Sequence, residues 1–111
     1  MQQRQGASLF RVEIEPEREH VRVIAHGELD LATVDDLQAQ IEALRSNGTA
    51  AIVLDLRQLS FMDSTGLRLL LTLDAAARSD GFDFSILDGE GPVRRLLELT
   101  RLDGRFRHAD G

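Results

Sequence analysis

The sequence contains no cysteine and no lysine. Without cysteine, the chain has no disulfide scaffold, no cysteine-ligated metal site and no thiol catalysis. All 13 of its basic residues are arginine, which excludes a phosphate-loop lysine, Schiff-base chemistry and any phosphoacceptor site that depends on lysine. Several large classes of enzyme and signalling domain are therefore ruled out.

Long apolar runs are also absent. None approaches the roughly 20 residues that cross a bilayer, and residues 1–6 show no signal-peptide pattern, so we expect a cytoplasmic protein without a membrane span. The net charge of −6 argues against direct nucleic-acid binding, which favours a basic surplus. A length of 111 residues, of which 42% are hydrophobic, predicts one globular domain after a flexible N-terminus at residues 1–7.

Four segments show the patterns of β-strands. Alternation of apolar and charged residues over 10–14 and 20–25 predicts two strands joined by a polar turn, antiparallel to each other. The nearly continuous apolar segment 50–56 predicts a buried strand. Alternation returns at residues 82–86, which predicts a fourth strand.

Three segments show helical spacing. The first covers residues 34–44, with Thr33 as a plausible N-cap and Asn47-Gly48 as its end. The second runs from the junction at residues 63–66 to Asp80-Gly81, and the third begins at Pro92. Residues 102–111 fit no clear element, although residues 105–107 resemble a short edge strand.

The predicted order is β-β-α-β-α-β-α, an α/β fold. Because crossovers between parallel strands are right-handed, we expect a mixed sheet of four to five strands with helices mainly on one face. Functional sites of such sheets collect beyond the carboxyl ends of the strands. Residues 27–30 and 61–66 both lie there, so these two loops are expected to be neighbours.

The second loop, FMDSTGL at residues 61–67, joins a strand to a helix, and its Ser64 is either a helix cap or a working group. Nucleophilic catalysis is disfavoured because no G-x-S-x-G elbow is present and His26 is the one imidazole near the loops. Asp30, Asp55 and Asp63 are a possible Mg²⁺ set, but a cap for Asp63 and a turn for Asp30 are favoured. We therefore expect a binding protein rather than an enzyme, without metal or cofactor.

The third possibility makes Ser64 a phosphate acceptor. A phosphate there meets free backbone N–H groups and the positive end of a helix dipole, and it adds about −1.5 to −2 charges beside Asp63. Arg68, one turn along, neutralises part of that charge. Gly66 permits either a close ligand or tight helix packing. Phe61 and Met62 are either core or an apolar rim, with core favoured for Phe61.

Residues 27–30 (GELD) and 62–67 (MDSTGL), at this spacing, resemble the STAS domain of bacterial anti-sigma factor antagonists. The resemblance covers residues 8–108 and leaves 109–111 as a tail. It implies that the unphosphorylated chain binds an anti-sigma factor, an ATP-using serine kinase, and so releases a sigma factor. It also implies that this kinase phosphorylates Ser64 and that a metal-dependent, PP2C-type serine phosphatase reverses the modification. The implied environment of the phosphosite and partner surface is Asp30, Met62, Asp63, Thr65, Gly66, Leu67 and Arg68.

Two departures and one alternative remain. The family usually carries a further C-terminal helix that this sequence does not show, and Arg68 stands where many relatives have a small residue. The arginines at 94, 95, 101, 105 and 107 form either a basic contact surface or, by preference, a solvated face. The alternative function is a constitutive STAS interaction module, such as a lipid-transport complex subunit or a sensory scaffold.

Overall fold

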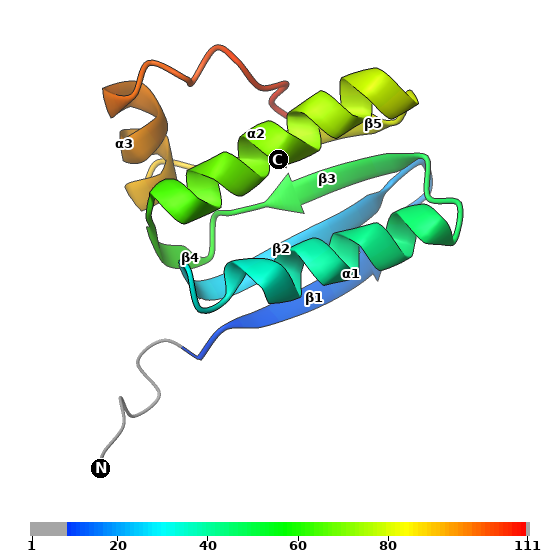
Figure 1. Cartoon of the computed structure of the whole chain (residues 1–111), viewed down its shortest axis with the longest axis horizontal. Coiled ribbons are helices and arrows are strands. Elements are labelled where there is room, and N and C mark those ends of the chain that lie inside the picture. The colour runs from blue at the N-terminus through cyan, green and yellow to red at the C-terminus, as the bar shows by residue number, and fades with distance from the viewer. Residues whose placement is uncertain (1–8, 111) are drawn as a thin grey trace.

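The computed structural model describes residues 9–110 (Figure 1). The expected flexible segment at residues 1–7 lies outside this range, as does Gly111 of the expected tail. In chain order the elements are β1 (Arg11–Pro16), β2 (Val21–Leu29), α1 (Val34–Ser46), β3 (Ala51–Asp55), β4 (Leu59–Met62), α2 (Ser64–Asp80), β5 (Asp83–Leu87) and α3 (Pro92–Leu99).

The five strands form one mixed sheet. Its main path is β1-β2-β3-β5, in which β1 is antiparallel to β2 and the other neighbours are parallel. Strand β4 pairs in parallel with β2, further along that strand than β3 does. The predicted mixed α/β sheet is confirmed, with the initial hairpin and the parallel crossovers where the sequence pattern put them.

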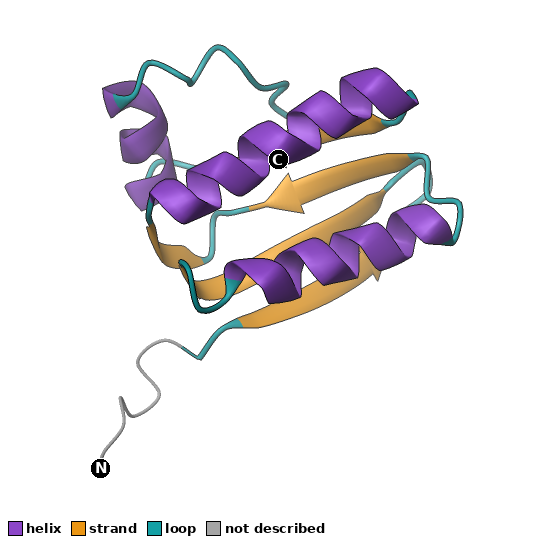
Figure 2. Cartoon of the chain, in the orientation of Figure 1, coloured by secondary structure: helices purple, strands orange, loops and turns teal. Residues whose placement is uncertain are grey.

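Helices α1 and α2 cover one face of the sheet, whereas α3 lies at its end against β4 (Figure 2). The core between the sheet and the helices takes alternate strand residues, among them Val23, Ile52 and Ile86, each at most 1% exposed. Successive right-handed crossovers in one direction place both long helices on the same face. The predicted helix arrangement is confirmed, and within residues 9–110 no helix is long and apolar enough to span a membrane.

The helix ends also follow the predicted signals. Helix α1 is followed by Asn47 and by Gly48 at φ 94°, and α2 ends at Gly81, which is left-handed at φ 78°. Pro92 is the first residue of α3, where its missing N–H is not needed. These local signals were sufficient because they act within a few residues of the chain.

Strand β4 is absent from the predicted element order, so that order needs a correction. Its four residues have buried ends and an exposed centre in place of the alternation that marks a strand. The pairing with β2 is irregular at Gly27 and Glu28. Gly27 has φ 96°, and a Cβ there would lie 2.9 Å from the Leu9 carbonyl oxygen. A residue with a side chain would therefore be strained at Gly27, both by its positive φ and by the close approach of Leu9.

Two smaller expectations need correction. Thr33 is the N-cap residue of α1, as predicted, but its side chain makes no capping hydrogen bond, because its hydroxyl bonds to residues a few positions before it. Residues 105–107 form no strand: Phe106 is 5% exposed in the core, and the backbone pairing of this segment with the sheet is a single parallel bridge from His108 to Ile86.

Candidate functional site

Strand β4 brings the two predicted loops together. Met62 lies opposite Leu29 in the parallel pairing of β4 with β2, and the Asp63 N–H donates to the Leu29 carbonyl at 3.3 Å. Asp30 directly follows Leu29, so it lies beside the Asp63-Ser64 junction. The expectation that the two loops are neighbours is confirmed, and the strand that joins them is the one that the sequence did not predict.

Asp63 caps helix α2. Its Oδ1 accepts from the backbone N–H of Thr65 at 2.8 Å and from that of Gly66 at 3.2 Å. Ser64 is the first helical residue and is exposed. The capping role that the sequence left open for Ser64 therefore belongs to Asp63, and the serine hydroxyl faces solvent at the start of the helix.

The charges around the junction are not neutralised within the protein. Asp30 and Asp63 are partly exposed and Arg68 is exposed, and within residues 9–110 none of the three forms an ion pair. The first turn of the 17-residue helix α2 contains no acidic residue. Its N-terminal end is thus a place where the helix dipole favours added negative charge.

The other predicted site residues divide by burial. Met62 and Leu67 are 5% and 8% exposed, and Gly66 is buried as well. A Cβ at Gly66 would lie 2.6 Å from Met62 Cγ and 3.1 Å from Leu29 Cδ2, which favours the close-packing explanation for this glycine. These three residues shape the junction from inside, whereas Thr65 is half-buried at its surface.

Two large apolar side chains next to the junction are exposed. Phe61 is 43% exposed, so the preference for a core position was wrong, because in β4 it is Met62 that points into the core. Leu31, which sequence analysis did not single out, directly follows Asp30 and is 77% exposed. The sequence signal for this exposed residue is an apolar side chain in the middle of a polar turn between a strand and a helix.

The structure gives no support to the catalytic and metal alternatives. His26 Nε2 lies 2.8 Å from Glu13 Oε1, across the β1–β2 hairpin. Asp55 is 2% exposed and is paired with Arg22 and Arg57, so it does not converge with Asp30 and Asp63. No group of three potential metal ligands occurs in the described part of the chain.

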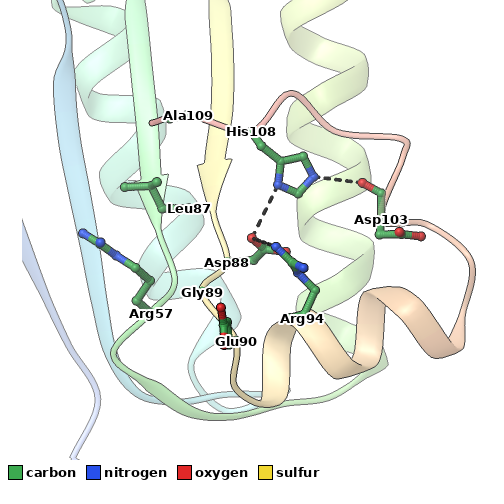
Figure 3. A pocket seen from close by; sticks show the side chains of 9 residues that line it. All are labelled: Arg57, Leu87, Asp88, Gly89, Glu90, Arg94, Asp103, His108 and Ala109. Atoms are coloured by element: carbon green, nitrogen blue, oxygen red, sulfur yellow. Dashed lines mark hydrogen bonds and ion pairs between the residues drawn. The ribbon is translucent and has the colours of Figure 1, made fainter. Parts of the chain in front are cut away.

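A second acidic site lies at the end of β5, in a hollow of about 430 Å³ (Figure 3). Asp88 is 4% exposed; its carboxylate accepts from Arg94 Nε at 2.9 Å and lies 3.4 Å from His108 Nδ1. Burial alone would raise the pKa of Asp88, but the hydrogen bond and the charge of Arg94 outweigh it and lower that pKa. The charge of this hollow is therefore compensated from within.

Comparison with known proteins was decisive once this geometry was established. Residues 12–108 match the family described as "Mlab, STAS domain". The chain belongs to the STAS domain family.

Relatives of this STAS domain share the name that the sequence resemblance implies. An anti-sigma F factor antagonist of Paenibacillus polymyxa is 36% identical over 94 residues, 84% of this chain and 80% of the relative. An anti-sigma-B factor antagonist of Staphylococcus aureus is 37% identical over 76 residues, 68% of this chain and 70% of the relative.

Solved STAS structures agree with this fold. An anti-sigma factor antagonist from Mycobacterium paratuberculosis has a TM-score of 0.77 at 27% identity and covers 92% of this chain and 86% of its own. The antagonist SpoIIAA in its unphosphorylated form gives a TM-score of 0.70 at 27% identity over 91% and 88% of the two chains. Its phosphorylated form from Bacillus gives 0.66 at 25% identity over 91% of each.

This STAS domain differs from the implied pattern at its C-terminal end. No helix follows α3 within the described residues. The extended segment at residues 105–109 covers the edge of β5 instead, held by Arg105 Nε donating to Asp74 at 3.0 Å and by the Ala109 N–H donating to the Ile86 carbonyl at 2.9 Å. Of the five arginines of the predicted basic end, Arg94, Arg105 and Arg107 pair with Asp88, Asp74 and Asp83, whereas Arg95 and Arg101 are exposed. The internal pairs were anticipated neither by the basic contact surface nor by the preferred solvated face.

Proposed function

We propose that this STAS domain is an anti-sigma factor antagonist controlled by phosphorylation of Ser64. The proposal rests on the different roles of Asp63 and Ser64 at the start of α2. Asp63 satisfies the Thr65 and Gly66 N–H groups, which leaves Ser64 exposed and without a structural role. A kinase therefore reaches this hydroxyl without unfolding the helix.

The helix end also favours the phosphorylated product. A phosphate on Ser64 lies at the positive end of the α2 dipole, which favours added negative charge. Arg68 is exposed one turn along the helix, at the spacing that lets side chains of one helix face interact. The fold of the switch is accordingly the same in both states, and the surface charge is what changes.

That change of charge acts on the partner surface. In the unphosphorylated state the exposed apolar side chains of Leu31 and Phe61 flank Asp30, Asp63 and the neutral Ser64. A phosphate adds roughly two negative charges to this cluster. A surface complementary to the neutral loop then meets like charge or loses its fit, which costs several kcal/mol in an interface.

The partners of the proposed switch are an anti-sigma factor that is also an ATP-using serine kinase, and a PP2C-type serine phosphatase. Binding of the unphosphorylated domain frees the sigma factor, and both partners act in the cytoplasm. The relatives that are named anti-sigma factor antagonists support the first partner. The proposal includes no direct nucleic-acid contact, in keeping with a net charge of −6.

Phosphorylation by the anti-sigma factor kinase of the same organism, with ATP, tests the proposal. Mass spectrometry should find one phosphate per chain, on Ser64. The Ser64→Ala variant should remain unlabelled, whereas Ser79→Ala, at the exposed far end of the same helix, should be labelled like the wild type. Equal labelling of Ser64→Ala would place the phosphate elsewhere and contradict the proposal.

A binding assay separates the switch from the alternative, a constitutive STAS interaction module. If the phosphorylated chain bound its partner as tightly as the unphosphorylated chain, the domain would be a constitutive module even though Ser64 is modified. The proposed switch requires the phosphorylated chain to dissociate.

A further inference from the structure

The hydroxyl of Thr33 is used in an unexpected way. It donates to the Glu28 carbonyl at 2.8 Å and accepts from the Asp30 N–H at 3.0 Å. It therefore bridges the backbone on both sides of Leu29, at the end of β2 where β4 is paired. A threonine that looked like a helix cap instead closes the turn that carries Asp30.

Asp30 is held at three atoms by this turn. Its N–H is bound by the Thr33 hydroxyl, its carbonyl accepts from the N–H of Thr33 at 3.1 Å and of Val34 at 2.9 Å, and its Oδ1 accepts from the Ala32 N–H at 3.0 Å. Within residues 9–110, no hydrogen bond or ion pair reaches the other carboxylate oxygen, Oδ2. The turn thus fixes Asp30 and leaves one oxygen available to another molecule.

This fixed carboxylate lies beside the proposed phosphoacceptor. Leu29 is paired with Met62 in the sheet, and its carbonyl accepts from the Asp63 N–H. Asp30 directly follows Leu29 and Ser64 directly follows Asp63, so both residues lie just beyond this pairing. Asp30 thus borders the surface that is proposed to meet the anti-sigma factor.

We propose that Thr33 is a positioning residue for partner binding: its hydroxyl holds the Asp30 carboxylate in the orientation that the anti-sigma factor recognises next to Ser64. The inference rests on the proposed function and deepens it. Thr33 does not touch the partner itself. It acts through Asp30, because a preorganised carboxylate loses less conformational freedom on binding than a mobile one.

Replacement of Thr33 by valine keeps the shape and removes the hydroxyl, with its bonds to the Glu28 carbonyl and the Asp30 N–H and its 3.3 Å contact with Asp30 Oδ1. We expect the affinity of the unphosphorylated chain for the anti-sigma factor, measured by isothermal titration calorimetry, to fall about tenfold. Thr33→Ser retains the hydroxyl and should bind like the wild type. As a matched control, Thr100→Val removes another backbone-bonded hydroxyl, which donates to the Leu96 carbonyl at 2.8 Å, and should leave the affinity unchanged.

A double-mutant cycle tests whether Thr33 acts through Asp30. Asp30→Asn alone should weaken binding, and the double variant Asp30→Asn/Thr33→Val should bind no more weakly than Asp30→Asn. A merely structural threonine would give independent losses that multiply. Such multiplication, or a Thr33→Val variant that binds like the wild type, would overturn the inference.

A measurement on the wild-type chain keeps the test decisive if Thr33→Val does not fold. The Asp30 amide, bound to the Thr33 hydroxyl, should exchange its hydrogen more slowly than the amide of the exposed Leu31; equal rates would overturn the inference. The proposed function is tested by other results: it is contradicted if Ser64 is not labelled or if the wild type does not bind the anti-sigma factor. The inference about Thr33 is tested by the affinities of the variants relative to the wild type.

Discussion

The molecule places an aspartate directly after three of its parallel strands, β2, β4 and β5, and it uses those after β2 and β5 in opposite ways. Asp88, after β5, is buried in an ion pair with Arg94 and lies 3.4 Å from His108 Nδ1. Asp30, after β2, is held by backbone N–H groups of its own turn and has no cation partner within the described residues. A carboxylate that finds its cations inside the protein stabilises the fold, and one that does not is left to interact with something outside it.

The difference arises from which segment lies opposite each strand end. Helix α3 and the C-terminal segment bring Arg94 and His108 over the end of β5 (Figure 3). The end of β2 instead faces β4 and the start of α2, which supply Asp63, Ser64 and the exposed Phe61. One end of the sheet is closed by opposite charge, and the other presents like charge and apolar surface.

The largest expected effect is a loss of partner affinity from a change at Ser64, beside the end of β2. Ser64→Asp adds one negative charge beside Asp63, and we expect it to lower the affinity for the anti-sigma factor about 100-fold, because like charges in an interface cost several kcal/mol. Ser79→Asp adds the same charge at the far end of α2 and should leave the affinity unchanged. Surface plasmon resonance measures both affinities. An equal loss of affinity in the two variants would mean that the net charge of the chain, and not the position of the added charge, causes the effect.

The next largest effect comes from replacing each of the two aspartates, Asp88 and Asp30, by asparagine. Asp88→Asn leaves Arg94 and His108 without their carboxylate, and we expect a loss of about 2 kcal/mol in the free energy of unfolding. Asp30→Asn should change it by no more than about 0.5 kcal/mol, as for other surface substitutions. Urea unfolding gives these values, and binding assays should show the reverse ranking. Equal effects on stability would mean that the two sites do not differ as described.

The pH dependence of the free energy of unfolding should depend on Asp88, at the end of β5. Because Arg94 lowers the pKa of Asp88 below its ordinary 3.8, the unfolded chain takes up this proton first as the pH falls. The stabilisation is complete above that value and is lost progressively at lower pH. Urea midpoints from pH 6 to pH 2.5 should therefore fall less steeply for Asp88→Asn than for the wild type. Parallel curves would show that Asp88 does not contribute.

The smallest effect concerns the phosphorylated state. If Arg68 neutralises part of the phosphate charge, Arg68→Gln should raise the second pKa of the phosphoserine, ordinarily about 6, by about 0.3. A ³¹P NMR titration measures it, with Arg95→Gln, an exposed arginine on α3, as the control. An unchanged value in Arg68→Gln would mean that this arginine does not face the phosphate.

Most of the fold was accessible from the sequence because its signals are local. Periodicity located both long helices and four of the strands, and Asn47, Gly81 and Pro92 marked helix boundaries as predicted. Strand β4 escaped because four residues without alternation carry no periodic signal. Phe61 was assigned to the core for the same reason, since the side of the sheet that a residue faces is unknown until its strand is recognised.

The candidate site was predicted residue by residue but not in its arrangement. The motif around Ser64 and the GELD segment pointed to two loops that the pairing of β2 with β4 brings together. The sequence favoured Asp63 as a cap and the structure confirms it, but the spacing left a cap possible for Ser64 as well. Nor does the spacing show that Thr33 bonds back to Glu28 and Asp30. Those choices depend on which donors and acceptors lie within about 3 Å.

The sequence alone determined that this chain has no cysteine or lysine chemistry, that it forms an α/β domain, and that a hydroxyl stands where a strand meets a helix. Composition and periodicity suffice for these points, because they depend on residue types and on neighbours along the chain. The tertiary structure decided that Ser64 is exposed, that Asp30 is beside it, and that Asp88 rather than Asp30 obtains an internal cation. Asp30 and Ser64 come from segments distant in sequence, and only the pairing of β2 with β4 brings them together. Arg94 is six residues from Asp88 and reaches it because α3 folds back at the end of β5.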